Sequence, residues 1–367
     1  MKIDRRVLLN FEWVLPMLVL LICAIGLINL YSAGHNLQVS ANPPYLKQAY
    51  WVVMGMGLMI LTFSVDYRII VRYGYLIYGF SILLLVAVFL YGHMTNGSQR
   101  WLVLWGFSFQ PSELVKLTMI IALAKYIDEH KAQGGYTLAT LVVPFIFVSI
   151  PCLLILKQPD LGTALFLLIL FFSIVLFVGI QKRTFVTLLG TGFFLLPLLW
   201  IFMKDYQKER LLTFLNPELD PLDSGYHIIQ SIIAIGSGGI LGKGFLKGTQ
   251  SQLKFLPEQQ TDFVFSVFAE EWGFLGVIVL LILFLALILW GFRIGRRARD
   301  LPGLLIAYGA TVYIFWAMFI NIGMVLGLLP VVGIPLPFFS YGGSSMVVLM
   351  VSIGLMMNVS MRRFVLQ

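Results

Sequence analysis

Asp262 is the residue whose type and position most strongly suggest chemistry. It lies where a long polar stretch meets an apolar helical pattern that begins at Phe263, and Pro257 restricts the approach of the chain. A carboxylate at the boundary between water and lipid is costly to desolvate, and acidic residues in such places usually bind or transform something. Asp262 is therefore the first candidate for a functional residue.

A second group of candidates stands at the start of another apolar segment. Glu113 and Lys116 have i, i+3 spacing, which places both on one face of a helix. Pro111 and Ser112 are typical of a helix start, with Ser112 as the expected cap. One interpretation is an internal salt bridge that neutralises both charges near the membrane surface. Because ionisable residues within a membrane usually mark functional sites, we favour a site, which would also include Gln110.

Two arginines could bind an anion. Arg100 stands beside Trp101, and a guanidinium can contact phosphate oxygens through two parallel hydrogen bonds. Arg210 lies among other charges of a long polar loop, where a solvated surface charge is the simpler explanation. Arg100 is therefore the more informative of the two.

The segment 335–345 combines glycine, proline and aromatic residues near the end of the chain. Non-helical backbone at membrane depth is tolerated where protein or a water-filled cavity satisfies its polar groups. The segment is either a broken, re-entrant piece of structure or the wall of a substrate cavity, and the sequence favours neither.

The elements that must position these residues are membrane helices. The chain of 367 residues is 59% hydrophobic and only 11% charged, which indicates an integral membrane protein. Its apolar runs predict an all-α bundle of about ten transmembrane helices in a single domain, with a large extracytoplasmic loop, 204–262, between the seventh and the eighth. The predicted helices span 13–32, 49–64, 73–91, 111–127, 138–156, 161–180, 184–203, 263–292, 302–327 and 343–360.

Orientation follows from the basic residues. Short loops on the side of the N-terminus carry most of the lysine and arginine, for example Arg293, Arg296 and Arg297, so both termini are predicted to be cytoplasmic. The net charge of +8 is then a topology signal and does not indicate a nucleic-acid partner. The candidate residues all fall on the outer side. The long loop there contains an apolar stretch, 226–235, that predicts a short helix at the interface.

Two other patterns carry little functional weight. The glycine-rich stretch 236–244 looks like a phosphate loop, but Ser237 and Gly244 stand where that motif requires Gly and Ser or Thr. Its glycines are better explained by a turn or a close approach of the backbone. Cys23 and Cys152 both lie in apolar runs and are expected to be free, buried residues. No His or Cys spacing indicates zinc.

Several strings together resemble the SEDS family of bacterial cell-wall polymerases, and within it the branch that acts in cell elongation. They follow one order along nearly the whole chain, at 97–101, 110–116, 158–164, 225–231, 248–262 and 335–345. One departure is Gln260, where relatives commonly carry His. A hydrogen-bonding role of that His could be partly shared by Gln260, whereas a proton-handling role could not.

The resemblance implies a peptidoglycan glycosyltransferase that polymerises lipid II into β-1,4-linked glycan with inversion at the anomeric carbon. Asp262 is then the general base, with Glu113 and Lys116 as further catalytic candidates, and cations on the pyrophosphate leaving group stabilise its charge. A lysine close to Asp262 would weaken it as a base, whereas burial would strengthen it. The residues expected to bind substrate are Arg100, Gln110, Ser112, Arg210, Thr249, Gln250 and Glu258.

The resemblance also implies partners and a location. The partners are lipid II, a class B penicillin-binding protein and elongation-complex proteins such as MreC, in the bacterial cytoplasmic membrane with the active site facing outward. The partner protein is expected to contact the outer loops and the eighth and ninth helices. A divalent cation, Mg²⁺ or Mn²⁺, could help or replace the basic side chains. The alternative function is a flippase for the lipid-linked precursor, but a transporter should bind its cargo near the membrane midplane.

Overall fold

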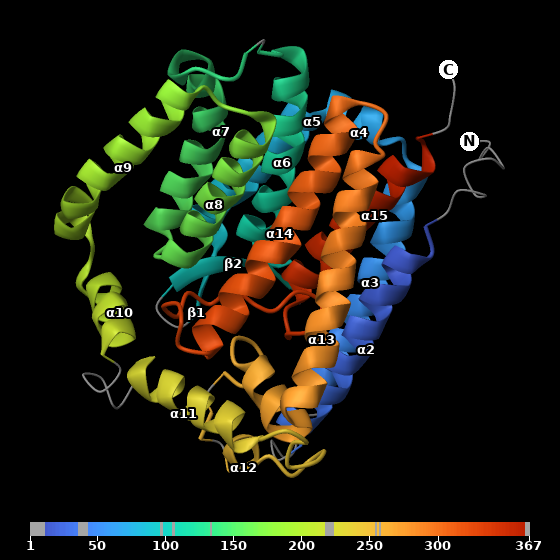
Figure 1. The fold of residues 1–367 in the computed structure, drawn as a ribbon, viewed down its shortest axis with the longest axis vertical. Coiled ribbons are helices and arrows are strands. Elements are labelled where there is room, and N and C mark those ends of the chain that lie inside the picture. Colours follow the sequence, from blue (N-terminus) through green and yellow to red (C-terminus); the bar gives the residue numbers. More distant parts are fainter. Residues whose placement is uncertain are drawn as a thin grey trace.

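A helical bundle makes up most of the computed structural model, which describes residues 12–35, 43–95, 98–104, 107–132, 134–216, 224–253, 255–256 and 258–363 (Figure 1). Pro257, expected to restrict the approach to Asp262, lies outside the described residues. The longer helices are α2 (Val14–Gly34), α3 (Pro44–Ser64), α5 (Gly74–Tyr91), α6 (Pro111–Glu129), α7 (Leu138–Lys157), α8 (Leu161–Val178), α9 (Lys182–Phe202), α13 (Val264–Arg296), α14 (Leu301–Val325) and α15 (Gly343–Met361). They correspond in order to the ten predicted helices.

Eight of these helices, within the described part of the chain, are long and apolar enough to cross a membrane. The other two are α6, which carries Glu113, Lys116 and Lys125, and α9. The first described helix begins and the last helix ends at the same end of the bundle (Figure 1). The chain is thus an all-α polytopic membrane protein, as the sequence predicts.

The centre of the bundle is formed by α15 and α14. In their spans 83% and 67% of the residues are buried, compared with 22% in α3. The hydrophobic faces of α3 and α13 that remain exposed are therefore the surfaces that lipid would cover. The central helix α6, which carries the Glu113–Lys116 pair, packs against both α5 and α14. A charged pair at this depth is enclosed by protein on several sides.

A small antiparallel sheet, which the sequence analysis did not predict, occupies the segment between α5 and α6. Strands β1 (His93–Thr95), β2 (Ser98–Leu104) and β3 (Phe107–Phe109) pair in that order, with Leu102 opposite Phe109. Strand pairing within the segment gives hydrogen bonds to backbone N–H and C=O groups that would otherwise be unsatisfied near the membrane. The sheet lies towards the end of the bundle opposite the termini (Figure 1).

Helix α13 is not the single continuous helix predicted over 263–292. It breaks at Gly273, whose φ is 62°, and continues to Arg296. The glycine-rich stretch docks on this break: the amides of Lys243 and Gly244 donate to the carbonyls of Glu270 and Glu271, at 3.0 Å each, and the amide of Phe274 donates back to the stretch. The glycines thus allow a close backbone contact with a helix of the same chain, whereas the sequence suggested a turn or a close approach to a ligand.

Further short helices lie outside the spans. They are α4 (Tyr67–Arg72), α10 (Asp205–Leu215), α11 (Ser224–Ser237) and α12 (Thr249–Gln252). Helix α11 confirms the short helix predicted over 226–235. It also packs on protein, because the Ser231 hydroxyl lies 2.8 Å from that of Ser266 and donates to the Val325 carbonyl at 2.6 Å. The loop that ends at Asp262 is thereby anchored to the bundle.

Candidate active site

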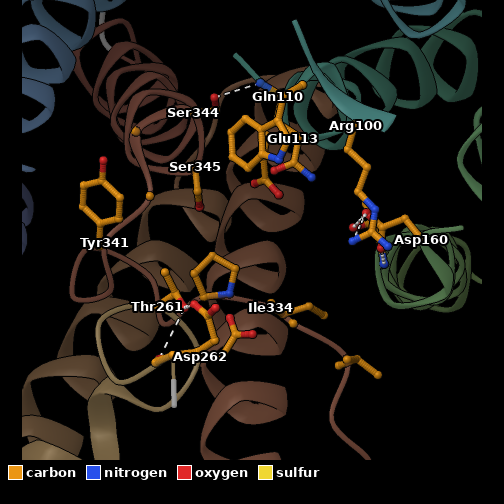
Figure 2. A pocket seen from close by; sticks show the side chains of 18 of the residues that line it. Arg100, Gln110, Glu113, Asp160, Thr261, Asp262, Ile334, Tyr341, Ser344 and Ser345 are labelled. Carbon is orange, nitrogen blue, oxygen red and sulfur yellow. Dashed lines mark hydrogen bonds and ion pairs between the residues drawn. The ribbon is translucent and has the colours of Figure 1, made fainter. Parts of the chain in front are cut away.

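A cavity of about 470 Å³ gathers polar residues from segments far apart in the sequence. The cavity is lined by residues of β2, α6, α10 and α15 and of the loops that precede α8, α13 and α15. Its charged lining residues are Arg100, Glu113, Lys116, Asp160, Arg210, Glu258 and Asp262. Six of these seven are residues that the sequence analysis singled out, and Asp160 is the one that it missed. Figure 2 shows Gln110 and Glu113 on one wall, Arg100 and Asp160 on another, and Asp262 on a facing loop.

Asp262 lies in the turn just before α13 and is held there by the backbone. The Asn321 side-chain amide donates to the Asp262 carbonyl at 3.0 Å and to the Ile334 carbonyl at 2.8 Å, which ties two loops together. A carboxylate oxygen of Asp262 faces Gly333, so that a Cβ at Gly333 would lie 3.6 Å from it. The side chain is therefore directed into the cavity from a fixed backbone.

The surroundings of Asp262 favour its protonated form. Loss of hydration raises the pKa of Asp262 from 3.8 to about 6, and the nearby charges of Glu258 and Asp160 act in the same direction. The Arg210 charge lowers the pKa and opposes them. Asp262 thus stays ionised at neutral pH but binds a proton far more readily than an exposed aspartate. These are the properties that a general base requires.

Glu113 and Lys116 form the ion pair that the first interpretation predicted, and they also line the cavity. The Lys116 ammonium lies 2.5 Å from one Glu113 oxygen, and the Tyr313 hydroxyl donates to the other at 3.0 Å. The ammonium also lies 4.9 Å from the centre of the Phe166 ring. Both charged side chains are almost fully buried. The two interpretations are therefore compatible, because the salt bridge forms part of the cavity wall.

Arg100 is fixed against the start of α8. It lies 3.7 Å from the Asp160 carboxylate and donates to the carbonyls of Gln158, at 3.3 Å, and Pro159. Asp160 also caps α8, accepting from the amide and the hydroxyl of Thr163 at 3.1 and 2.9 Å. The signal that could have found Asp160 is its position as an N-cap before an apolar run. Asp160 also belongs to the stretch 158–164 that carries part of the family resemblance.

Gln110 and Ser112 have different positions. Gln110 lines the cavity, and its backbone N–H donates to the Ser344 hydroxyl of the last loop at 2.9 Å. Ser112 is buried and is not among the residues that line the cavity. The prediction that Ser112 caps α6 is wrong. The helix begins at Pro111 with Gln110 as its N-cap, and no side chain makes a capping hydrogen bond there.

Thr249 and Gln250 lie beside Glu270 and do not line the cavity. The Thr249 hydroxyl and the backbone N–H of Gln250 donate to one Glu270 oxygen at 3.1 and 3.0 Å. The Lys243 ammonium donates to the same oxygen at 2.7 Å. Because Glu270 is fully buried in α13, this arrangement fastens α12 to the helix that follows Asp262. The charge of Glu270 within an apolar run could have marked it, by the argument that singled out Glu113, but its partners cannot be read from the sequence.

The segment 335–345 forms a wall of the cavity, with Tyr341, Ser344 and Ser345 among its lining residues. The Tyr341 amide donates to the Gln260 carbonyl at 2.9 Å, which joins this wall to the loop that carries Asp262. The Gln260 side chain does not line the cavity; its amide nitrogen lies near Gly34 of α2. In this structure the side chain at position 260 is therefore directed towards α2.

A divalent cation would need ligands beyond those that the described residues supply. Among them no three His, Cys, Asp or Glu side chains converge closely enough to hold a metal ion. Glu258 and Asp262 approach one another in the cavity, and two carboxylates together with water or a substrate phosphate are the usual surroundings of Mg²⁺. The need for a metal therefore stays a prediction, and the chemistry below is derived from side chains.

Comparison with known proteins identifies the family. A family model for FtsW, RodA and SpoVE, described as "Cell cycle protein", matches residues 12–364. The peptidoglycan glycosyltransferase MrdB of Escherichia coli K12 is 42% identical over 317 residues, which cover 85% of this chain and 84% of that protein.

Solved structures agree with this assignment. A chain from a structure on the "structural coordination of polymerization and crosslinking by a peptidoglycan synthase complex" has a TM-score of 0.82 at 35% identity, covering 96% of this chain and 98% of that one. The rod shape determining protein RodA of Thermus thermophilus has a TM-score of 0.71 at 30% identity, with the same coverage of both chains. The chain therefore belongs to the SEDS family of peptidoglycan glycosyltransferases, the family of FtsW, RodA and SpoVE, as its motifs indicated.

Proposed function

We propose that this protein polymerises lipid II into β-1,4-linked glycan during cell elongation, with Asp262 as the general base. The observation that carries the proposal is the cavity itself. It combines a carboxylate whose pKa is raised to about 6 with three cationic side chains, Arg100, Lys116 and Arg210. Transfer of a sugar from a pyrophosphate requires both a base for the acceptor and positive charge for the leaving group.

In the proposed reaction an acceptor sugar hydroxyl attacks the anomeric carbon of the donor. The new C–O bond forms as the bond to the pyrophosphate oxygen breaks, and Asp262 takes the hydroxyl proton. Direct displacement converts the α-linkage of the donor into a β-linkage, and undecaprenyl pyrophosphate leaves with the bonding electron pair. The Asn321 contact that fixes the Asp262 backbone supports this role, because a general base must be held within hydrogen-bond reach of the hydroxyl.

The cations have unequal access to the leaving group. Lys116 is buried and already held by Glu113, so its charge acts at a fixed position in the wall. Arg100 is partly exposed and is oriented by two backbone carbonyls. Arg210 reaches the same cavity from α10. We assign Arg100 and Arg210 to the pyrophosphate, with Glu258 and Gln110 as further substrate contacts.

Location and partners follow from the charge pattern and the family. The excess of basic residues in short loops supports cytoplasmic termini, and the loop that carries Asp262 and lines the cavity then faces outward from the bacterial cytoplasmic membrane. The similarity to a chain of a peptidoglycan synthase complex supports a transpeptidase partner, a class B penicillin-binding protein. We expect that partner to contact the outer loops, α13 and α14, and MreC to belong to the same assembly.

The test is polymerisation of lipid II by the purified protein, with and without its cognate transpeptidase. Wild type is expected to make polymer, and Asp262→Asn, which keeps the size of the side chain, is expected to make none. Asp128→Asn is the matched control, since Asp128 lies in the last turn of α6 and pairs with Lys131 on the surface.

Two results would contradict the proposal in different ways. Normal polymerisation by Asp262→Asn would remove Asp262 from the chemistry and make Glu113 the next residue to test. Absence of polymer from wild type even with its partner, together with movement of lipid II across vesicles, would favour the flippase.

A further inference from the structure

A row of exposed leucines on α13 leads directly into a cluster of arginines. Leu281, Leu285 and Leu289 are 37%, 54% and 58% exposed, and Arg293 and Arg297 continue the same series at intervals of four residues. Residues four apart lie above one another on a helix and form a continuous ridge. At 1.5 Å per residue the ridge from Leu281 to Arg293 is roughly 18 Å long, which is more than half the thickness of a bilayer's hydrocarbon core.

The basic end of this ridge is hollowed. Leu289, Phe292, Arg293, Arg296 and Arg297 line a pocket of about 390 Å³ at the end of α13. Arg293 is oriented there by the Trp290 ring, since its guanidinium carbon lies 4.5 Å from the ring centre. The pocket is therefore basic on one side and apolar on the side that meets the leucines.

The charges in this pocket have no acidic partner in the part of the chain that the structure describes. Among the described residues, no acidic side chain forms an ion pair with Arg293, Arg296 or Arg297. Other arginines at the same end of the bundle are paired: Arg68 with Asp300, at 3.4 Å, and Arg362 with Asp66, at 3.3 Å. The positive-inside bias explains why basic residues lie at this end, but it requires neither a pocket nor an adjoining apolar ridge.

We propose that the ridge and pocket at the end of α13, from Leu281 to Arg297, bind an anionic phospholipid. The arginines take the phosphate through charge-assisted hydrogen bonds, and an acyl chain lies along the exposed leucines. Charge complementarity selects an anionic headgroup, and the position at the end of a membrane-spanning helix selects a lipid over a soluble phosphate. This site is separate from the cavity around Asp262 and does not depend on the proposed reaction. The transpeptidase is also expected to contact α13, so the proposal assigns the stretch from Leu281 to Arg297 to the lipid and not to that partner.

The experiment is native mass spectrometry of the purified full-length protein in micelles that contain equal amounts of phosphatidylglycerol and phosphatidylcholine. Wild type is expected to retain phosphatidylglycerol selectively. Arg293→Gln, Arg296→Gln and Arg297→Gln together should weaken this binding, by roughly fivefold for each arginine if a basic residue near the membrane surface contributes about 1 kcal/mol.

A matched control removes the same charge elsewhere at this end of the bundle. Lys131→Gln, Lys182→Gln and Arg183→Gln together replace three exposed basic residues outside the pocket and should leave lipid retention unchanged. If both triple variants lose the lipid equally, binding reflects general surface charge and the proposal is wrong. Equal retention of the two lipids by wild type would overturn it as well.

Two further variants keep the test decisive if the glutamine variant does not insert properly. Changing the three arginines to lysine preserves the topology signal but removes the forked donors, so phosphatidylglycerol retention should fall while the protein remains folded. Leu285→Ala with Leu289→Ala should weaken binding of long-chain phosphatidylglycerol but not of the dihexanoyl form.

If a membrane-spanning helix of the transpeptidase occupies the ridge and excludes the lipid, the ridge is a protein interface and the proposal fails.

Discussion

Tyr313 of α14 donates a hydrogen bond to Glu113 of α6 over 3.0 Å, while Lys116 holds the other oxygen of the same carboxylate. The carboxylate is thus satisfied on both sides before any substrate arrives. Tyr313 also lies with its ring 5.5 Å from the Lys116 ammonium and packs edge to face on Phe166. The two helices that meet at the centre of the bundle are therefore joined by a buried ionic group that is also part of the cavity wall.

Breaking this ion pair should destabilise the protein strongly. Glu113→Gln or Lys116→Met each leaves its partner charged and buried, and such changes cost about 3–5 kcal/mol. The double variant removes both charges and should recover much of the lost stability. Thermal unfolding in detergent would check this, and additive losses in the double variant would contradict it.

The same variants separate a structural role from a catalytic one. If the pair only supports the fold, the double variant Glu113→Gln, Lys116→Met should regain lipid II polymerisation along with stability. We expect it to remain inactive, because its cavity would lack the fixed charges beside the substrate. Tyr313→Phe is the milder comparison, with an expected loss of about 1–3 kcal/mol and residual activity.

The pH dependence of the reaction should follow the ionisation of Asp262. Its pKa of about 6 predicts an activity that rises as the pH increases through 6, because only the ionised carboxylate can accept a proton. Glu258→Gln removes a negative charge that raises this pKa, so the rise should move to lower pH. Arg210→Gln removes a positive charge that lowers it, so the rise should move to higher pH.

The measurement is the rate of lipid II polymerisation as a function of pH at low substrate concentration. The midpoint of the rise at acid pH should shift in opposite directions in the two variants. A common shift in both variants would mean that the rise reports another group. Arg210→Gln should also weaken substrate binding if Arg210 contacts the pyrophosphate, so each profile must be compared by its midpoint and not by its height.

Asp262→Asn should lose activity without losing stability. In the unfolded chain Asp262 ionises near 3.8, whereas in the folded protein it resists ionisation up to about 6. The folded state therefore loses stability relative to the unfolded state as the pH rises through this window, and the full loss persists above it. An amide avoids that loss, so the variant should be as stable as wild type or more stable at pH 7.5, by at most about 3 kcal/mol.

Melting temperatures of the two proteins at pH 7.5 and pH 4 provide the measurement. The difference between variant and wild type should shrink at pH 4, where Asp262 is protonated in the folded protein. A variant that is much less stable than wild type at both values would show that the loss of activity comes from misfolding.

Gly273→Ala should be far more damaging than an alanine at an ordinary helical glycine. The backbone there has a φ of 62°, and a Cβ would lie 2.2 Å from the Gly242 nitrogen, so strain of about 1–3 kcal/mol adds to a clash between two backbones. Gly57→Ala in α3 is the control, because a Cβ at Gly57 meets nothing within 4 Å. Expression level and thermal unfolding of the two variants compare them directly, and equal stability would contradict the prediction.

Much of the fold could be predicted because lipid imposes a simple rule on the backbone. A span must satisfy its own hydrogen bonds, so each long apolar run becomes a helix, and the ten predicted runs correspond to ten helices. The small sheet escaped prediction because its strands are short and lie outside the spans. The break in α13 escaped because its cause, the docking of residues 239–244 on Gly273, is a contact between distant segments.

The candidate site could be predicted at the positions where a charged residue lies within or beside an apolar, membrane-spanning segment. Asp262, Glu113 and Lys116 are costly in or near a membrane, and all three line one cavity. Thr249 and Gln250 were selected from the resemblance alone, and the structure places them beside Glu270. Glu270 itself is buried in an apolar run with no outward sign of its partners, which only the fold brings near.

The glycine-rich stretch 239–244 and the break in α13 are joined by backbone hydrogen bonds, so the two segments should unfold locally as one unit. The amides of Lys243, Gly244, Phe274 and Leu275 take part in the same set of backbone hydrogen bonds. None of them can be freed without separating the stretch from the helix, so they should exchange with solvent at a common rate. Asp262 stands between these two partners in the sequence, at the base of the helix. This shared hydrogen-bonded unit would hold the carboxylate at a fixed position relative to α13.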